Sequence, residues 1–446
     1  MNKDHPPKIE SSKTLRERVE EFEFHPEVYL YPTPRMYGLL VHFALGDAIF
    51  TEEVNVYVHI PFCKQICSFC GYLKMIDSQN LRGEYVDAVV EEINLYQTIL
   101  DGRKIKTLHF GGGTPSLLTP EELEQIITAL RKINPAVLKT SEEVSIEATP
   151  ESVEYDKFHR FKELGINRVS LGVQSFNNSE IALSKRKNLS DVSVRAIEIL
   201  RKVGIPNIVI DLMIGIEGQT VKSFEESVTE ALELRPETVE LYALGLMPQT
   251  GLGKRSPTTL MTGEEIYRCY DIARALFLEA GYAQDCHNRY ALPGRGSFLQ
   301  EDYVFQGMSL IGFGAGVRSY ATNVHYRNTY DSVNARKAIL GYMNNIKAAQ
   351  HSVESGIFLN DEEKMRQYVI GHFEEMDKDE FQRRFGAPFE KKFGSIYREI
   401  IDLDLAKDDG HILLLTPQGL TFRDLIVKQF FSDRAKEVEI TYRPRR

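Results

Sequence analysis

Six apolar segments with the character of buried strands alternate with amphipathic helices between residues 54 and 246. This alternation predicts a parallel sheet whose strands are joined by right-handed helical crossovers. Six such units are typical of a partial barrel and not of the closed eight-unit form. We therefore expect an α/β fold built on a partial (β/α)6 barrel. The expected strands are 54–60, 106–110, 143–148, 168–175, 207–215 and 239–246, and the expected helices are 81–100, 119–133, 151–165, 191–204 and 221–234.

The rest of the chain falls on either side of this barrel. The segment from Tyr29 to Gly38 carries two prolines, so it cannot be a continuous helix. A long helix is expected over 263–281, and the glycine-rich segment 309–320 fits either a strand or a loop. Near the end, a strand, a T-P-x-G turn and a final helix indicate a winged-helix-like cap. We expect an N-terminal extension (1–50), the barrel (51–250), a barrel extension (251–350) and a mainly helical C-terminal domain (351–446).

Composition limits the class of partner. The chain has 446 residues, of which 42% are apolar and 26% charged, as in a soluble globular protein. Its net charge of -10 repels phosphate backbones, so nucleic acid is not an expected partner. We find no run of about 20 apolar residues that could span a bilayer. The polar N-terminal segment lacks the apolar stretch of a secretory signal, which predicts a cytoplasmic protein.

Three of the five cysteines fall within eight residues, in the spacing C-x3-C-x2-C. In a reducing compartment such clustering favours a metal or cluster site over disulfides. Thiolates from Cys63, Cys67 and Cys70 can bind three irons of a cubane cluster and leave the fourth iron open to a cosubstrate. A zinc site would need a fourth ligand such as Cys269, Cys286 or His287, none of which has a paired spacing with the loop. A third possibility is three unrelated buried cysteines.

The segment Y-V-H-I-P-F-C, from Tyr57 to Cys63 and on to Cys70, resembles the signature of radical S-adenosylmethionine (SAM) enzymes. More narrowly, the chain is similar over about residues 30–430 to the group typified by oxygen-independent coproporphyrinogen III oxidase. The resemblance implies a radical SAM barrel and a [4Fe-4S] cluster that cleaves SAM to a 5′-deoxyadenosyl radical. It rests also on the motifs Gly111–Ser116, Arg168–Phe176 and Asp211–Gly215, which occur in the family's order.

Polar residues on three successive expected strands are candidates for binding SAM. Glu147 and Gln174 stand near the carboxyl ends of the third and fourth strands, and Asp211 lies within the fifth. Ligands of parallel α/β sheets gather at this edge, where a carboxylate can bind ribose hydroxyls. Arg186 suits a bidentate contact with the carboxylate of SAM. Each residue also fits an ordinary surface or helix-capping role.

Two glycine-rich runs are further candidates, because glycines after a strand let the backbone approach a ligand closely. The resemblance implies that the run beginning at Gly111 contacts the amino group of SAM. The run 311–316 would cradle the second SAM that this group often binds, although a structural turn fits it equally. Two aromatic residues flank the cluster, and the second of them would pack on the adenine or shield the cluster from water. These expectations name Tyr57, Phe69, Gly111, Gly112, Gly113, Thr114, Gly314 and Ala315.

The reaction is predicted from the residue after the cysteine loop. Coproporphyrinogen oxidases carry a further cysteine there, whereas this chain has Tyr72. Tyr72 followed by Leu-Lys resembles the class C radical SAM methyltransferases. The leading hypothesis is therefore C-methylation of an sp² carbon of an aromatic substrate, a quinone such as menaquinone or a heteroaromatic ring, with a second SAM as methyl donor. The alternatives are oxidative decarboxylation of coproporphyrinogen, opening of heme, and a non-catalytic heme-binding, chaperone-like role.

These hypotheses also specify partners. The substrate would be an aromatic small molecule held by region 251–350 together with the second SAM. The cluster would receive its electron from a reductase, a flavodoxin or a ferredoxin. A lipid quinone would require transient contact with a membrane surface, for which the sequence shows no obvious amphipathic anchor.

Overall fold

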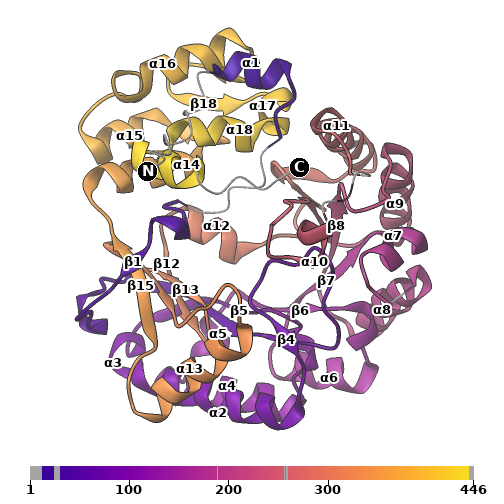
Figure 1. Ribbon diagram of the computed structural model, residues 1–446, viewed down its shortest axis with the longest axis vertical. Helices are drawn as coiled ribbons and strands as arrows, with labels where there is room; N and C mark the ends of the chain where they lie inside the picture. The colour runs from indigo at the N-terminus through magenta and orange to yellow at the C-terminus, as the bar shows by residue number, and fades with distance from the viewer. Residues whose placement is uncertain (1–12, 25–30, 188, 256, 258–259, 441–446) are drawn as a thin grey trace, which may run out of the picture.

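The computed structural model describes residues 13–24, 31–187, 189–255, 257 and 260–440 (Figure 1). Its central feature is one continuous sheet in the order β1-β15-β14-β13-β12-β2-β5-β6-β7-β8-β9-β11-β10. Strands β12 to β9 in this order are all parallel, so the sheet has a seven-stranded parallel centre. The parallel strands are β2 (Glu53–Ile60), β5 (Lys104–Gly112), β6 (Glu143–Ala148), β7 (Arg168–Gln174), β8 (Asn207–Ile214), β9 (Thr238–Ala243) and β12 (Ser309–Phe313).

These strands form because their apolar residues are buried on both faces. In β8 every residue except Asp211 is buried, as expected for a parallel strand covered on both sides. Helices run along the outside of the strands (Figure 1). They are α2 (Gln79–Leu95), α3 (Gln97–Leu100), α4 (Pro120–Ile133), α5 (Val137–Thr140), α6 (Tyr155–Glu163), α7 (Asn178–Leu183), α8 (Ser190–Val203), α9 (Val221–Leu234) and α11 (Gly263–Glu279).

Local signals in the sequence set several helix ends. Thr119 caps α4 in a reciprocal capping box with Glu122, and Pro120 takes the first helical position. Gly204 ends α8 in the left-handed conformation, with φ of +81°. Two predicted helices were wrong in extent. The helix expected over 81–100 breaks at Tyr96, and the one expected over 151–165 begins only at Tyr155, after a short 3-10 turn.

Antiparallel strands extend the parallel centre at both edges and leave the sheet open. The strands β13, β14, β15 and β1 follow β12, and β11 and β10 follow β9. The expected α/β fold with a partial barrel and a helical C-terminal region is confirmed. The bounds are β1 (Gly38–Leu39), β10 (Ala283–Cys286), β11 (Arg289–Ala291), β13 (Arg318–Tyr320), β14 (Val324–Asn328) and β15 (Val353–Phe358), with α10 (Gly251–Arg255), α12 (Leu299–Phe305) and α13 (Ala335–Lys347) between them.

The C-terminal region has a hydrophobic core of its own. N-terminal residues, among them Leu15, Val19 and Tyr31, belong to this second core, and Figure 1 shows α1 (Leu15–Glu20) beside the C-terminal helices. The region combines a three-stranded antiparallel sheet, β16 (Glu375–Asp377), β18 (Ile412–Leu415) and β17 (Ala406–Asp408), with α14 (Asp361–His372), α15 (Lys378–Phe385), α16 (Phe389–Asp402), α17 (Pro417–Thr421), α18 (Arg423–Val427) and α19 (Asp433–Ile440).

The T-P-x-G segment starts a helix here and does not form a turn. Thr416 accepts the N–H of Gly419 as the cap of α17, and Pro417 is its first residue. The four-part division of the chain, including the winged-helix-like cap, stays a prediction, and residues 1–12 and 25–30 of the expected extension lie outside the described residues. None of the helices that the structure describes is long and apolar enough to cross a bilayer.

Candidate functional site

A cavity of about 2150 Å³ opens at the carboxyl ends of the parallel strands and extends to the N- and C-terminal regions. Most residues singled out from the sequence share it, although they come from separate parts of the chain. Gly111, Gly314 and Ala315 are the three that are not part of its lining. The residues that do line the cavity are Tyr57, Cys63, Cys67, Phe69, Cys70, Gly112, Gly113, Thr114, Glu147, Gln174, Arg186 and Asp211.

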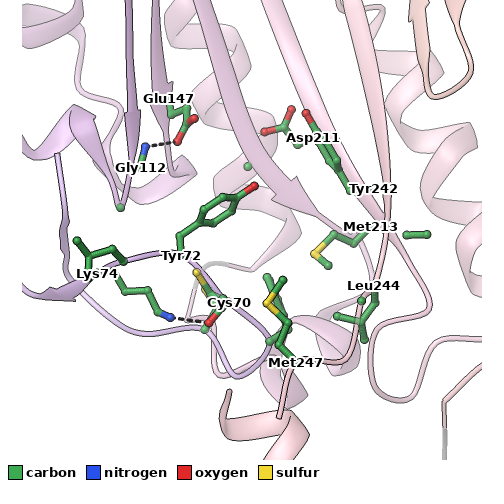
Figure 2. A pocket seen from close by; sticks show the side chains of 18 of the residues that line it. Cys70, Tyr72, Lys74, Gly112, Glu147, Asp211, Met213, Tyr242, Leu244 and Met247 are labelled. Atoms are coloured by element: carbon green, nitrogen blue, oxygen red, sulfur yellow. Dashed lines mark hydrogen bonds between the residues drawn. The ribbon is translucent and has the colours of Figure 1, made fainter. Parts of the chain in front are cut away.

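The cysteine loop is closed at its base and anchored along its length. Short strands β3 (Phe62–Cys63) and β4 (Met75–Ile76) pair in parallel at its two ends. The N–H of Ser68 donates to the carbonyl oxygen of Ser184 at 3.1 Å, and the N–H of Leu252 donates to that of Ser68 at 2.7 Å. The ammonium group of Lys74 donates to the carbonyl oxygen of Cys70 at 2.5 Å (Figure 2). The loop therefore has a defined path around the cavity.

The three thiols suit a cluster of several irons. Burial raises the pKa of Cys63 to about 12 and also raises that of Cys70, so a positive charge is needed to hold them as thiolates. No three His, Cys, Asp or Glu side chains in the described part of the chain converge on one metal ion. A cubane binds each thiolate at a different iron, so its cysteines surround a volume instead of a point. Cys63, Cys67 and Cys70 stay the predicted ligands of such a cluster.

Glu147 is held at the end of β6 by two donors. The N–H of Gly112 donates to Oε2 at 3.0 Å (Figure 2). Nε2 of His109 lies 3.2 Å from Oε1. Burial alone would raise the pKa of Glu147, but these contacts lower it below its ordinary value. A methyl group on Gly111 would lie 2.7 Å from both Oε1 of Glu147 and the hydroxyl of Tyr57. A side chain at position 111 would therefore displace Glu147 or Tyr57.

Arg186 connects the cysteine loop with the end of β7. One of its terminal nitrogens donates to the carbonyl oxygen of Gly172 at 2.5 Å, and the other lies 3.9 Å from the sulfur of Cys67. Gln174, also at the end of β7, has a left-handed backbone with φ of +73°. Its side-chain oxygen is buried and has no hydrogen-bond partner among the described residues. This unpaired acceptor is a candidate contact for a ligand hydroxyl.

Asp211 lies deeper, within β8. The hydroxyl of Ser170 donates to both of its oxygens, at 2.8 and 2.9 Å. Burial and the nearby Glu240 raise the pKa of Asp211 to about 8. Arg168 binds Glu240 at 2.6 Å, so the charged groups at this depth partly neutralise one another. Asp211 is therefore poised to exchange a proton near neutral pH.

Gly314 and Ala315, the two residues predicted from the second glycine-rich run, face away from the cavity. The N–H of Gly314 donates to Glu92, and that of Ala315 donates to the hydroxyl of Tyr85, so α2 binds this turn from behind. The next residues, Gly316 to Arg318, line the cavity instead. Any contact with a second SAM from this run would thus come from residues 316–318.

The sequence reasoning missed several lining residues. Figure 2 shows Met213, Leu244 and Met247 as an apolar wall beside Cys70, with Tyr72 pointing from the loop into the cavity. Met213 lies at the end of β8, and Leu244 directly follows β9. The expectation that ligands gather at strand ends, which selected Glu147, therefore also points to these two residues. Phe69 packs against this wall. Arg318 of β13 and Arg327 of β14 also line the cavity, but no sequence motif around them indicates this position.

Comparison with known proteins agrees with this geometry. The model of the Radical SAM superfamily matches residues 57–231. The heme chaperone HemW of Escherichia coli is 30% identical over 60% of this chain and 70% of its own length. The oxygen-independent coproporphyrinogen III oxidase of Pseudomonas aeruginosa is 28% identical over 81% of each chain. The family model covers the cysteine loop and the strands β5 to β8.

The solved structure of coproporphyrinogen III oxidase from Escherichia coli superposes with a TM-score of 0.78, at 23% identity, over 90% of this chain and 96% of that one. That likeness shows the shared fold. Members of the superfamily use a [4Fe-4S] cluster and SAM, which favours the open cluster over the zinc site considered from the cysteine spacing. The chain belongs to the radical SAM family that contains HemW and the oxygen-independent coproporphyrinogen III oxidases.

Proposed function

We propose that this chain is a radical SAM enzyme that acts on an anionic tetrapyrrole. The observation that carries the proposal is the charge of the cavity. The whole chain has ten more acidic than basic residues, yet the cavity lining has eleven Lys and Arg against seven Asp and Glu. A cationic hollow in an acidic protein attracts an anionic ligand. The basic residues are Lys13, Arg18, Arg35, Lys64, Lys74, Arg168, Arg186, Arg318, Arg327, Lys428 and Lys436.

The size of the cavity supports a large substrate. Small-molecule sites commonly enclose about 300–1,000 Å³, whereas this cavity encloses about 2150 Å³. The space suffices for SAM against the strand ends and for a bulky ring system between the barrel and the C-terminal region. Both relatives described above are named for tetrapyrroles, heme in one case and coproporphyrinogen in the other. Both compounds carry carboxylate side chains that suit a basic lining.

Cys63, Cys67 and Cys70 would hold a [4Fe-4S] cluster, which would supply the electron for reductive cleavage of SAM to methionine and a 5′-deoxyadenosyl radical. The protein's part is to hold the sulfonium cosubstrate through Glu147, Gln174, Arg186 and Asp211, to place a substrate carbon near the 5′ position, and to exclude water. In oxidative decarboxylation the radical would take one hydrogen atom from a propionate side chain. Carbon dioxide and one electron would then leave, the electron passing to an acceptor, and a vinyl group would remain.

A heme chaperone role is the second candidate, favoured by the similarity to HemW. C-methylation ranks below both, because the relatives described above are not named as methyltransferases. Tyr72, the residue that suggested methylation, lines the cavity and is equally placed to contact a tetrapyrrole. The identity of the electron donor, whether reductase, flavodoxin or ferredoxin, stays a prediction.

Product analysis separates these functions. The reduced, cluster-loaded protein is incubated anaerobically with methyl-labelled SAM and coproporphyrinogen III. Our proposal predicts 5′-deoxyadenosine and carbon dioxide without labelled product. Labelled product with S-adenosylhomocysteine would instead establish methylation. Stoichiometric heme binding with neither product would establish the chaperone role, and no interaction with either tetrapyrrole would refute the proposal.

A further inference from the structure

Two arginines face each other across a hairpin in the cavity wall. Arg318 of β13 stands directly opposite Arg327 of β14, and both line the cavity. Directly opposed residues of an antiparallel pair project from the same face of the sheet. Like charges in this position destabilise the pairing. An arrangement of this kind is favourable once an anion lies between or beside the two guanidinium groups.

The folded chain does not itself provide that anion. Among the described residues, no carboxylate forms an ion pair with either guanidinium, and the rings of Tyr320 and Tyr330 lie beside them. The charge of Glu354 reaches Arg327, but this carboxylate accepts the N–H of Tyr330. The guanidinium of Arg327 lies 4.1 Å from the ring centre of Tyr330, and that of Arg318 lies 5.9 Å from that of Tyr320. Stacking on a ring leaves the N–H edge of a guanidinium open to a planar acceptor.

Two buried polar groups nearby also lack partners. Within the described part of the chain, neither Nε of Arg327 nor the hydroxyl of Tyr37 has a hydrogen-bond partner. Tyr37 lies close enough to feel the charge of both arginines. Among the described residues, the side chain of Arg327 makes one hydrogen bond, a long one of 3.4 Å to the hydroxyl of Ser355. Buried donors are normally paired, so this group of unpaired donors points to a missing acceptor.

We propose that Arg318 and Arg327 bind a carboxylate side chain of the substrate. This inference rests on the proposed function, because it takes the substrate to be a polycarboxylate. A carboxylate fits the fork of a guanidinium with two parallel hydrogen bonds. The pair lies beyond β12 and β2 in the sheet, on the opposite side of β5 from Glu147, Gln174 and Asp211. The clamp is therefore separate from these three predicted SAM contacts.

The position of the clamp makes it a device for orienting the ring. Tyr57 and Tyr72 lie close enough to Arg318 to contribute to its raised pKa, and both tyrosines line the same cavity. A carboxylate fixed at Arg318 and Arg327 would direct the rest of a rigid macrocycle toward the strand ends where SAM is expected. The pair thus determines which substituent of the ring meets the 5′ carbon.

The test uses the cluster-loaded holoenzyme and coproporphyrin III, the fluorescent oxidised form with four carboxylates. Its dissociation constant is measured for the wild type and for Arg318→Gln, Arg327→Gln and Arg336→Gln. Arg336 is exposed on α13 and is the matched control. We expect each clamp variant to bind coproporphyrin III about 10- to 100-fold more weakly. The control should be unchanged, and Arg318→Lys should restore part of the affinity. Cluster absorbance and melting temperature verify that each variant folds.

Two further arms identify the source of the carboxylate. The tetramethyl ester of coproporphyrin III should bind the wild type and the clamp variants equally, since it has no carboxylate to lose. The number of SAM molecules bound, measured by equilibrium dialysis, should also be unchanged. Loss of one SAM with unaltered porphyrin affinity would assign the pair to a second SAM and overturn the proposal.

The outcomes also separate this inference from the proposed function. Tight binding of coproporphyrin III by the wild type with unaltered affinity in both clamp variants would refute the clamp and leave the function standing. Absence of porphyrin binding by the wild type would refute the function and the clamp together.

Discussion

The carboxylate of Glu92 accepts the backbone N–H of Gly314 at 2.7 Å, which joins helix α2 to the turn after β12. The same side chain accepts hydrogen bonds from Tyr342 at 2.8 Å and Asn328 at 2.6 Å, and it is fully buried. Asn328 also donates to the carbonyl oxygen of Gly314 at 2.9 Å. Glu92 thus fixes the turn that carries the chain into the cavity wall and on to Arg318.

This buried carboxylate predicts a pH dependence of stability. Burial raises the pKa of Glu92 to about 7, above its ordinary value of 4.5. The stabilisation associated with the bound proton is fully present below about pH 4.5 and is lost as the pH rises through 7. The size of the loss is about 3 kcal/mol. Glu92→Gln, which has no proton to release, should lack this part of the pH dependence.

The measurement is urea unfolding of the wild type and of Glu92→Gln at pH 5 and pH 8. Glu91→Gln, on the exposed side of the same helix, is the matched control and should behave like the wild type. If the wild type and Glu92→Gln lose the same free energy of unfolding over this range, Glu92 is not the titrating group.

Gly111→Ala tests the packing behind Glu147. The added methyl would lie 2.7 Å from Oε1 of Glu147 and from the hydroxyl of Tyr57, closer than a side-chain carbon approaches such atoms. Glu147 must move and give up its hydrogen bond with Gly112, which should weaken SAM binding by about 1.5–3 kcal/mol. Gly83→Ala is the control, because its methyl would meet nothing within 4 Å. It should stabilise α2 by about 0.5–1 kcal/mol and leave SAM affinity alone. Equal SAM affinity in both variants would remove Glu147 from the site.

Arg186→Ala should weaken SAM binding by about 1.5–3 kcal/mol, the cost of a lost charged hydrogen bond. Titration calorimetry with the cluster-loaded protein measures this directly. Arg195→Ala is suited as the control, because Arg195 is an exposed arginine on α8 that pairs only with the helical neighbour Asp191 among the described residues. Unchanged affinity in Arg186→Ala would show that the cosubstrate carboxylate lies elsewhere.

Asp211 predicts a pH dependence of SAM binding. Its pKa of about 8 means that the free protein holds this side chain protonated at neutral pH. A cationic sulfonium ligand favours the charged carboxylate, so the affinity of the wild type should rise as the pH increases from 7 to 9. Asp211→Asn should abolish this rise, and Asp191→Asn, an exposed change, should retain it. A rise of the same size in Asp211→Asn would exclude Asp211 as its source.

The barrel was predictable because each of its units carries local information. The strand 207–215 consists almost entirely of apolar residues. The start of helix 119–133 is marked by the capping residues Thr119 and Glu122 and by Pro120. The order of parallel strands then follows from the handedness of the crossovers. Because parallel strands end at the same edge of the sheet, the residues at these ends line one cavity together with the three cysteines. The roles of these residues in binding a cluster or SAM stay predictions.

The rest depended on pairing between distant segments. Residues 309–313 form β12 by pairing with β2, more than 250 residues earlier, and their own composition does not specify this partner. The facing of Arg318 and Arg327 depends on the register of β13 with β14. The direction in which Gly314 faces depends on Glu92 of α2. Each of these is a tertiary choice that no local periodicity encodes.

The central claim is that three thiolates leave one iron open to SAM. The most direct measurement is anaerobic production of 5′-deoxyadenosine from SAM by the dithionite-reduced, iron- and sulfide-reconstituted wild type, compared with Cys67→Ala and with Cys286→Ala, whose cysteine lies outside the loop. We predict four irons per chain and 5′-deoxyadenosine from the wild type and from Cys286→Ala, and neither from Cys67→Ala. A Cys67→Ala protein that assembles a full [4Fe-4S] cluster and cleaves SAM at the wild-type rate would contradict the assignment.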